Sequence, residues 1–333
     1  MAEVASNWAP PYIHPYFANR VELVPLGCFS VLLGIFVDYV IITQSKMLGS
    51  FKYFVLNQTI WAQFLEIIML IFNPVFLSPY IAGYMEGILH NVASYECSVV
   101  ATTLSFIVYV NTAIGVTVSL VNRYIFTFFP QYRPLLENKI TIICLVLFQL
   151  AVHSVTIFLF VSTASDADTN RNYAKKETHT ALEQYYLQPG FIYLSEYGTV
   201  TRSLNKFMFG GLVVISSILA ASVILFIKNV IKQKKTSIIS KTAKSLIVSS
   251  IMQAILCICM LYTPMLLILG TWGFNIRNSS NIVNIFVTLL SIHGTFDMVS
   301  TLYFIIPYRK YCKNLLTCAR KITIVTSSSQ PHA

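Results

Sequence analysis

Residues 139–163 read KITIICLVLFQLAVHSVTIFLFVST, a run in which Lys139 is the only charged side chain. A helix needs roughly 20 apolar residues to cross the ~30 Å hydrocarbon core of a bilayer, and this segment is long enough. It is much longer than the roughly ten residues of a membrane β-strand and shows no strict alternation. The segment therefore predicts a transmembrane helix.

Six more segments of this kind flank it on both sides. Charged residues make up 11% of the 333-residue chain, against about 25% in an average soluble domain, while hydrophobic residues reach 56%. A soluble fold would have to bury too much apolar surface. We therefore expect an all-α membrane protein, a seven-transmembrane helix bundle forming a single domain over residues 1–333. Its other spans run about 22–43, 52–76, 97–122, 207–227, 246–269 and 282–306, followed by a short amphipathic helix.

The positive charges predict the orientation, because Lys and Arg are preferentially retained in the cytoplasm. Their distribution predicts that the N-terminus lies outside and the C-terminus in the cytoplasm. We expect the first span to serve as its own targeting signal. The net charge of +10 then belongs to one face, where it suits membrane lipids or an acidic partner protein rather than nucleic acid. Sixteen of the 23 basic residues fall on the inner side: Lys46, Lys52, Arg123, Arg133, Lys139, Lys228, Lys232, Lys234, Lys235, Lys241, Lys244, Arg309, Lys310, Lys313, Arg320 and Lys321.

Three acids lie inside predicted spans, Asp38 in the first, Glu66 in the second and Asp297 in the seventh. Ionisable groups in a membrane are expensive, and no Lys or Arg is expected near mid-bilayer to pair with them. They are either neutral acids bonded to nearby polar side chains or parts of a shared polar centre with water or a sodium ion. His293 precedes Asp297 by four residues, so the two share a helix face and can form a pair.

The outer half of the third span offers a candidate ligand surface. Thr102, Ser105 and Tyr109 are spaced three and four apart and lie on one helix face, where Tyr262 and His293 can meet them across the bundle. An apolar cavity with a few directed polar groups suits a small molecule. Such residues also commonly pack one membrane helix against another, and both interpretations stay open.

A proline and a long loop add two further features. Pro264 interrupts the sixth span and either permits its inner half to swing or makes a static kink. The outer loop at about 164–206 is either a lid over a binding cavity or a solvated excursion. It contains no cysteine, so Cys97 at the outer boundary is expected to be a free thiol. Cys312 and Cys318 follow the last span, as palmitoylation sites or as apolar residues of the amphipathic helix.

Several short motifs occur in a characteristic order along the chain. Asn122-Arg123-Tyr124 closes the third span and Pro307-Tyr308-Arg309 follows the seventh. Together with the motifs of the second span and the loop after it, they resemble the nematode serpentine chemoreceptors of the class H and class I group. Those motifs are Leu56-Asn57, Trp61, Glu66, Pro74, Pro79, Ala82-Gly83-Tyr84 and Gly87.

The resemblance implies a G-protein-coupled receptor in the plasma membrane, in the ciliary membrane of sensory neurons, that detects small-molecule odorants or pheromones. It places Asn122, Arg123 and Tyr124 at the contact with a heterotrimeric G protein. In rhodopsin-type receptors an acid often precedes this arginine, whereas this chain has Asn122 at that position. The acid of the second span is typically aspartate in the resembled group, and here it is Glu66. Taken without the resemblance, Arg123 is better explained as an interfacial arginine whose charged end reaches the membrane surface.

Other function classes make different demands on the sequence. A retinal-binding opsin needs a lysine in its last span, and none occurs between Arg277 and Lys310. An ion-coupled transporter, which would use the buried acids, more often has two related halves with paired broken helices. A ligand-gated channel of the insect odorant type would place its N-terminus inside. We expect no enzyme activity, no cofactor and no metal site.

Overall fold

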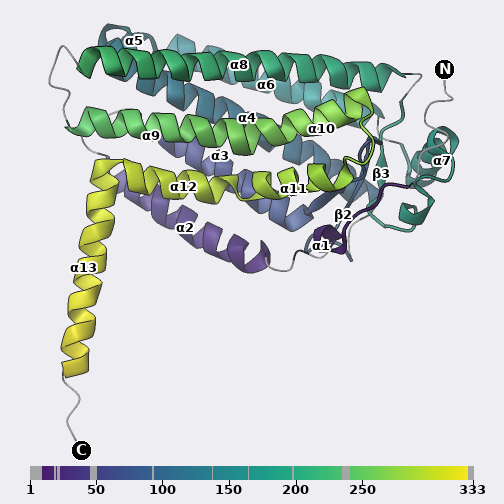
Figure 1. Ribbon diagram of the computed structural model, residues 1–333, viewed down its shortest axis with the longest axis horizontal. Helices are drawn as coiled ribbons and strands as arrows, with labels where there is room; N and C mark the ends of the chain where they lie inside the picture. Colours follow the sequence, from purple (N-terminus) through teal and green to yellow (C-terminus); the bar gives the residue numbers. More distant parts are fainter. Residues whose placement is uncertain are drawn as a thin grey trace, which may run out of the picture.

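The computed structural model describes residues 10–18, 20, 23–45, 51–91, 94–136, 138–163, 165–196, 199–234 and 241–328. Within these residues, seven helical segments are long and apolar enough to cross a membrane. Figure 1 shows them side by side, with the strands and two small helices gathered at one end of the bundle. The prediction of a seven-helix membrane bundle is confirmed.

The first five spans are continuous helices. They are α2 (Leu23–Gln44), α3 (Phe51–Phe72), α4 (Tyr95–Phe128), α6 (Lys139–Thr163) and α8 (Val200–Lys234). The fourth has the predicted bounds, while α4 and α8 extend beyond the bilayer-length segments expected for them. The second stops four residues early, because Asn73 has a positive φ of 38° and a strand begins at Pro74.

The sixth and seventh spans are interrupted. The sixth consists of α9 (Lys241–Cys257), a π-helical turn (Ile258–Tyr262) and α10 (Thr263–Phe274). Pro264 follows this turn and cannot donate a backbone hydrogen bond, which accounts for the wider coil before it. The seventh span is divided at Ile292 into α11 (Ser280–Ser291) and α12 (His293–Phe304).

A helical extension follows the seventh span. Helix α13 (Ile306–Ser328) leaves the bundle across the direction of the other helices (Figure 1). It is the helix predicted after the last span. Two shorter segments, the 3₁₀ turn Pro130–Tyr132 and helix α5 (Arg133–Leu136), join α4 to α6 at the same end of the bundle. We call this end, from which α13 departs, the basic end.

A small antiparallel sheet, which the sequence did not predict, covers the opposite end. Its strands are β1 (Pro74–Phe76), β2 (Ala82–Met85) and β3 (Ile192–Tyr193), in the order β1-β2-β3, with Val75 opposite Tyr84 and Gly83 opposite Ile192. Strands this short would not form a stable sheet alone. We call the sheet, helices α1 (Pro15–Ala18) and α7 (Ala167–Thr178), the 3₁₀ turn Glu183–Tyr185 and residues 10–18 and 20 the cap.

Asparagine side chains bind both edges of the sheet. Asn284 of α11 accepts from the backbone N–H of Phe76 and donates to its carbonyl, both at 3.0 Å. Asn170 of α7 makes the same pair of bonds with Tyr193, at 3.1 and 2.6 Å. A carboxamide carries the donor and the acceptor that a neighbouring strand would offer. The two asparagines therefore complete the edges and tie the sheet to the bundle and to α7.

The predicted loop at 164–206 contributes its described residues 165–196 to this cap. Its apolar side chains Leu182, Tyr185 and Phe191 are buried against the β1–β2 hairpin. The Tyr185 hydroxyl donates to the carbonyl of Pro11, and the backbone N–H of His14 donates to Asn281 of α11. The loop and the N-terminal segment together cover the end of the bundle, which disagrees with a solvated excursion.

Candidate functional site

The predicted acid Glu66 lies at the break in the seventh span. Its carboxylate accepts from the backbone N–H and the hydroxyl of Thr295, both at 2.6 Å. Thr295 is in the first turn of α12, where N–H groups lack partners within the helix, so Glu66 caps α12 from α3. A Cβ on Gly294 would lie 2.6 Å from Glu66 Oε2 and 2.7 Å from the carbonyl of Ala62. Glycine therefore permits this close approach of the two helices.

Asp297 lies two residues further along α12 and is buried. It accepts two hydrogen bonds of 2.9 Å from Nε2 of Gln58 on α3. The guanidinium of Arg123 interacts electrostatically with this carboxylate and donates to Ser249 of α9 at 2.9 Å. The expectation that no basic residue would lie near the buried acids is therefore wrong at Asp297. Arg123 joins α4, α9 and α12 instead of reaching the membrane surface, and its side chain is only 1% exposed.

The other predicted polar residues lie apart from this pair. Asp38 is half-buried between α2 and α3 and accepts from Gln63 at 3.2 Å. His293 is buried at the start of α12, and its Nδ1 has no hydrogen-bond partner within the described residues. The hydrogen bonds found at Asp297 come from Gln58 and Gln253 rather than from His293. The shared helix face did not produce the predicted pair.

Thr102, Ser105 and Tyr109 line a cavity in the half of the bundle nearest the cap. Its volume is about 60 Å³, and its apolar walls come from α3, α4, α10 and α11. A second cavity of about 40 Å³ shares part of this wall and extends beneath the sheet. We call the two together the outer cavity. The residues common to both are Pro74, Phe76, Met85 and Thr102.

Polar groups in the outer cavity differ in whether their hydrogen bonds are already made. The hydroxyls of Thr102 and Ser105 donate to carbonyls of their own helix at 2.8 Å. The indole N–H of Trp272 is buried and has no acceptor within the described part of the chain. Its ring packs edge-on against Phe76, with centroids 5.3 Å apart. The indole N–H is therefore the donor most in need of a partner.

The π-helical turn is held by α4 from two positions. The hydroxyl of Tyr109 donates to the carbonyl of Leu261 at 3.4 Å. The hydroxyls of Thr117 and Tyr262 are also 3.4 Å apart. Tyr109 and Thr117 are eight residues apart and so lie about two turns from each other. Tyr262 was predicted to face the outer cavity, and this prediction is wrong. The residue lines a larger cavity toward the basic end.

The Asn122-Arg123-Tyr124 motif lies inside the basic end of α4. Asn122 and Arg123 are buried, and Tyr124 accepts from Nδ2 of Asn229 on α8 at 3.1 Å. Further out on α13, Cys312 is partly exposed, and burial raises the pKa of its thiol. Cys318 belongs to the same helix, but its side chain lies outside the described part of the structure.

Sequence reasoning missed several partners of the predicted residues. Gln58, Gln253 and Ser249 lie inside predicted spans, and polar side chains there are themselves a signal for contacts between helices. The pair Gly294-Thr295 was also visible within the seventh apolar run. What the sequence lacked was any indication of which residues would meet, since Gln58 and Asp297 are 239 positions apart.

Comparison with protein families supplies an independent result. A family model described as "Serpentine type 7TM GPCR chemoreceptor Srh" matches residues 21–318. A search of curated proteins gave no match. The matched residues include all seven spans, the sheet and helix α7 of the cap, and most of α13.

Proposed function

The chain belongs to the Srh family of serpentine seven-transmembrane chemoreceptors, and from this we propose that it binds a small molecule in the outer cavity and activates a heterotrimeric G protein at its basic end. The single observation that carries the proposal is the match over residues 21–318. The ligand is a small-molecule odorant or pheromone. The protein works in the plasma membrane, in the ciliary membrane of sensory neurons.

The orientation in the proposal follows from charge. The basic end faces the cytoplasm and the cap faces outward, in accordance with the preference of Lys and Arg for the cytoplasmic side. Epitope tags at the two ends test this on intact cells. We expect staining of the N-terminal tag without permeabilisation and of the C-terminal tag only after it. The reverse pattern would remove the basis for a G-protein contact at the basic end.

The ligand class follows from the lining of the outer cavity. Leu65, Met69 and Ile268 supply apolar surface in the first cavity, and the indole N–H of Trp272 supplies one donor in the second. A small, largely apolar molecule with a single hydrogen-bond acceptor matches this set. Ligand pockets usually measure about 300–1,000 Å³, so the outer cavity as it stands is a closed form. Ligand binding therefore separates its walls.

Separation of these walls acts directly on the sixth span. Tyr109 lines the outer cavity and also holds the π-helical turn through Leu261. A ligand that displaces the Tyr109 ring loosens this contact and lets α9 move relative to α4. The bond between Arg123 and Ser249 transfers that movement to the basic end. A ligand that prefers the moved form by ~1.4 kcal/mol changes the equilibrium tenfold.

A functional screen tests the proposal. The chain is expressed in cultured cells with a promiscuous G protein, exposed to volatile and soluble mixtures, and assayed for second-messenger release. We expect a response that Arg123→Ala abolishes at equal surface expression. Ser105→Met fills the outer cavity and should weaken the response. Ser154→Met is the matched control, because Ser154 bonds its own helix in the same way but faces outward on α6.

Ion-coupled transport is the second candidate, and one observation favours it. The seventh span is broken next to a buried acid, Glu66, and broken spans beside buried polar groups occur at the substrate and ion sites of many transporters. The same screen separates the two. A ligand response that persists in cells lacking every G protein would favour a transporter or a channel over the receptor.

A further inference from the structure

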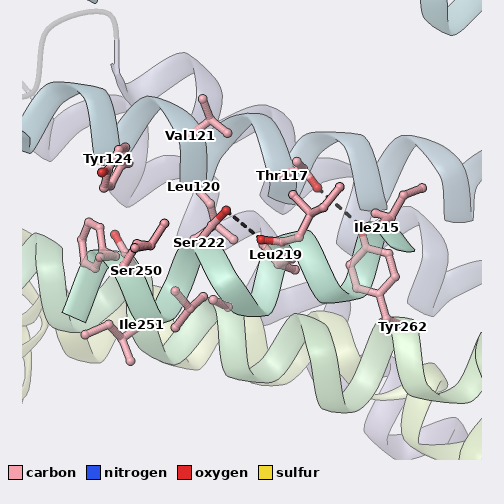
Figure 2. Close-up of a pocket in the computed structure, with 15 residues that line it drawn as sticks. Thr117, Leu120, Val121, Tyr124, Ile215, Leu219, Ser222, Ser250, Ile251 and Tyr262 are labelled. Carbon is pink, nitrogen blue, oxygen red and sulfur yellow. Dashed lines mark hydrogen bonds between the residues drawn. The ribbon is translucent and has the colours of Figure 1, made fainter. Parts of the chain in front are cut away.

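The largest cavity described in the structure lies away from the outer cavity, between α4, α8 and α9. Its volume is about 400 Å³, within the range of small-molecule sites. Figure 2 shows Tyr124 and Ser250 at one end of it and Thr117 and Tyr262 at the other. Because Tyr124 belongs to the basic end of α4, the cavity lies in that half of the bundle. We call it the inner cleft.

The inner cleft exists because α8 approaches the sixth span closely only near the cap. A Cβ on Gly270 would stand 3.1 Å from the Phe209 ring, and one on Gly273 would stand 3.2 Å from the backbone nitrogen of Lys206. These glycines let α8 pack tightly on α10. Toward the basic end, Ile251 and Ala254 occupy the facing wall, and the space between the helices remains open.

The inner cleft opens sideways, toward the lipid. Several of its lining residues are also accessible from outside the bundle, with Ile218 61%, Leu225 56% and Val121 45% exposed. All three are aliphatic and belong to predicted membrane spans. A hydrocarbon chain can enter from the bilayer without passing any charged group among these lining residues.

The length of the inner cleft matches one leaflet. Ile215 and Phe226 are the first and last residues of α8 that line it, and eleven residues of helix rise about 16 Å, roughly half of the ~30 Å hydrocarbon core. Lys228 follows Leu225 by three residues, so it lies on the same face one turn nearer the basic end. Its side chain is exposed. An acyl chain in the inner cleft would thus place its headgroup beside a lysine.

We propose that the inner cleft binds one acyl chain of an anionic phospholipid of the adjacent leaflet, with the headgroup at Lys228. The bound chain fills the space into which α9 would move and holds α4, α8 and α9 in the observed arrangement. The lipid is therefore a regulator bound at a site separate from that of the chemical stimulus. The binding itself does not depend on the proposed receptor function.

Photocrosslinking tests the proposal on the full chain. The protein is placed in nanodiscs of phosphatidylcholine containing trace phosphatidylserine or phosphatidylcholine probes with a diazirine in the acyl chain, and the labelled peptides are identified by mass spectrometry. We expect the phosphatidylserine probe to label α4, α8 and α9 at the inner cleft. Lys228→Gln should reduce that labelling about fivefold, the effect of one lysine near an anionic surface.

Matched variants make the result specific. Ser222→Phe fills the inner cleft from an exposed position on α8 and should abolish labelling there, while Ser217→Phe on the same helix lies outside the cleft and should not. Val121→Trp blocks the cleft from α4 if Ser222→Phe folds poorly. Lys313→Gln on α13 controls for general loss of charge. Equal labelling by both probes, or labelling unchanged by both filling variants, would overturn the proposal.

Discussion

Glu66 illustrates how one carboxylate can be accommodated inside a membrane protein without a basic partner among the residues that the structure describes. It is bound by the first turn of α12, where unpaired N–H groups and the helix dipole favour a negative charge. The free-energy cost of burying the carboxylate and the cost of leaving N–H groups unpaired at the helix break offset each other. Glu66 and the start of α12 therefore form one structural unit, and a substitution at either should affect the stability of both.

Replacing Glu66 by alanine should destabilise the bundle by about 1–3 kcal/mol, since the partly buried N–H of Thr295 would lose its acceptor. Glu66→Gln keeps an acceptor and should cost less. Asp38→Asn serves as the control, because Asp38 is half-buried and has a single described bond. Thermal unfolding of the purified protein measures the differences. Equal stability of Glu66→Ala and wild type would mean that α12 needs no cap.

Gly294 provides a second test at the same position. Gly294→Ala would place a methyl group against Glu66 and the Ala62 carbonyl, so we expect loss of stability comparable to other overpacked sites, about 1–3 kcal/mol. Gly210→Ala on α8 is the matched control, since no atom lies within 4 Å of its added Cβ. It should be neutral or raise stability by up to ~1 kcal/mol through helix propensity. Similar losses for both variants would argue against a steric role for Gly294.

Among the helices, the sixth span has the most direct link between the two cavities. Its π-helical turn contacts Tyr109, which lines the outer cavity, and Tyr262 of the turn itself lines the inner cleft. Such turns frequently occur at functional sites because an extra residue leaves carbonyl groups open to other donors. The turn therefore connects the ligand site of the proposed receptor to the helix that would move.

Tyr109→Phe should raise ligand-independent signalling. The substitution removes the hydroxyl that contacts the Leu261 carbonyl and keeps the ring, and a net hydrogen bond of ~0.5–1.5 kcal/mol corresponds to about a two- to tenfold change in population. Basal G-protein activation at matched surface expression measures it. Tyr303→Phe is the control, because Tyr303 is 60% exposed on the outer face of α12. Unchanged or lowered basal activity would contradict this use of the turn.

Across the molecule, the cap is held by hydrogen bonds rather than by disulfides. Cys97 is free, as expected from the loop that lacks cysteine. Glu177 accepts from the hydroxyls of Tyr193 and Ser195 and from the backbone N–H of Glu196, at 2.6–2.8 Å. Burial raises the pKa of Tyr193, and its bond to the Glu177 carboxylate raises it further. Tyr193 therefore remains a donor at neutral pH.

Glu177→Ala should loosen the cap while leaving the bundle folded, because three donors lose their common acceptor. We expect faster proteolysis within residues 165–196 in limited-digestion experiments. Glu183→Ala is the control, since Glu183 is exposed on the outside of the cap. Treatment of the wild type with a reductant should not reproduce the effect. Cleavage as slow in Glu177→Ala as in the control would show that Glu177 does not hold the loop.

The sequence alone predicted the seven spans, the helix that follows them (α13) and the family resemblance. The reason is physical, because crossing hydrocarbon requires about 20 apolar residues in each segment, whatever the rest of the chain does. Only the tertiary structure revealed three other features. They are the break at Ile292, the hydrogen bond from the first turn of α12 to Glu66, and the approach of Arg123 to Asp297. Each depends on side chains more than a hundred positions apart meeting inside the bundle, and spacing along one helix carries no information about such encounters.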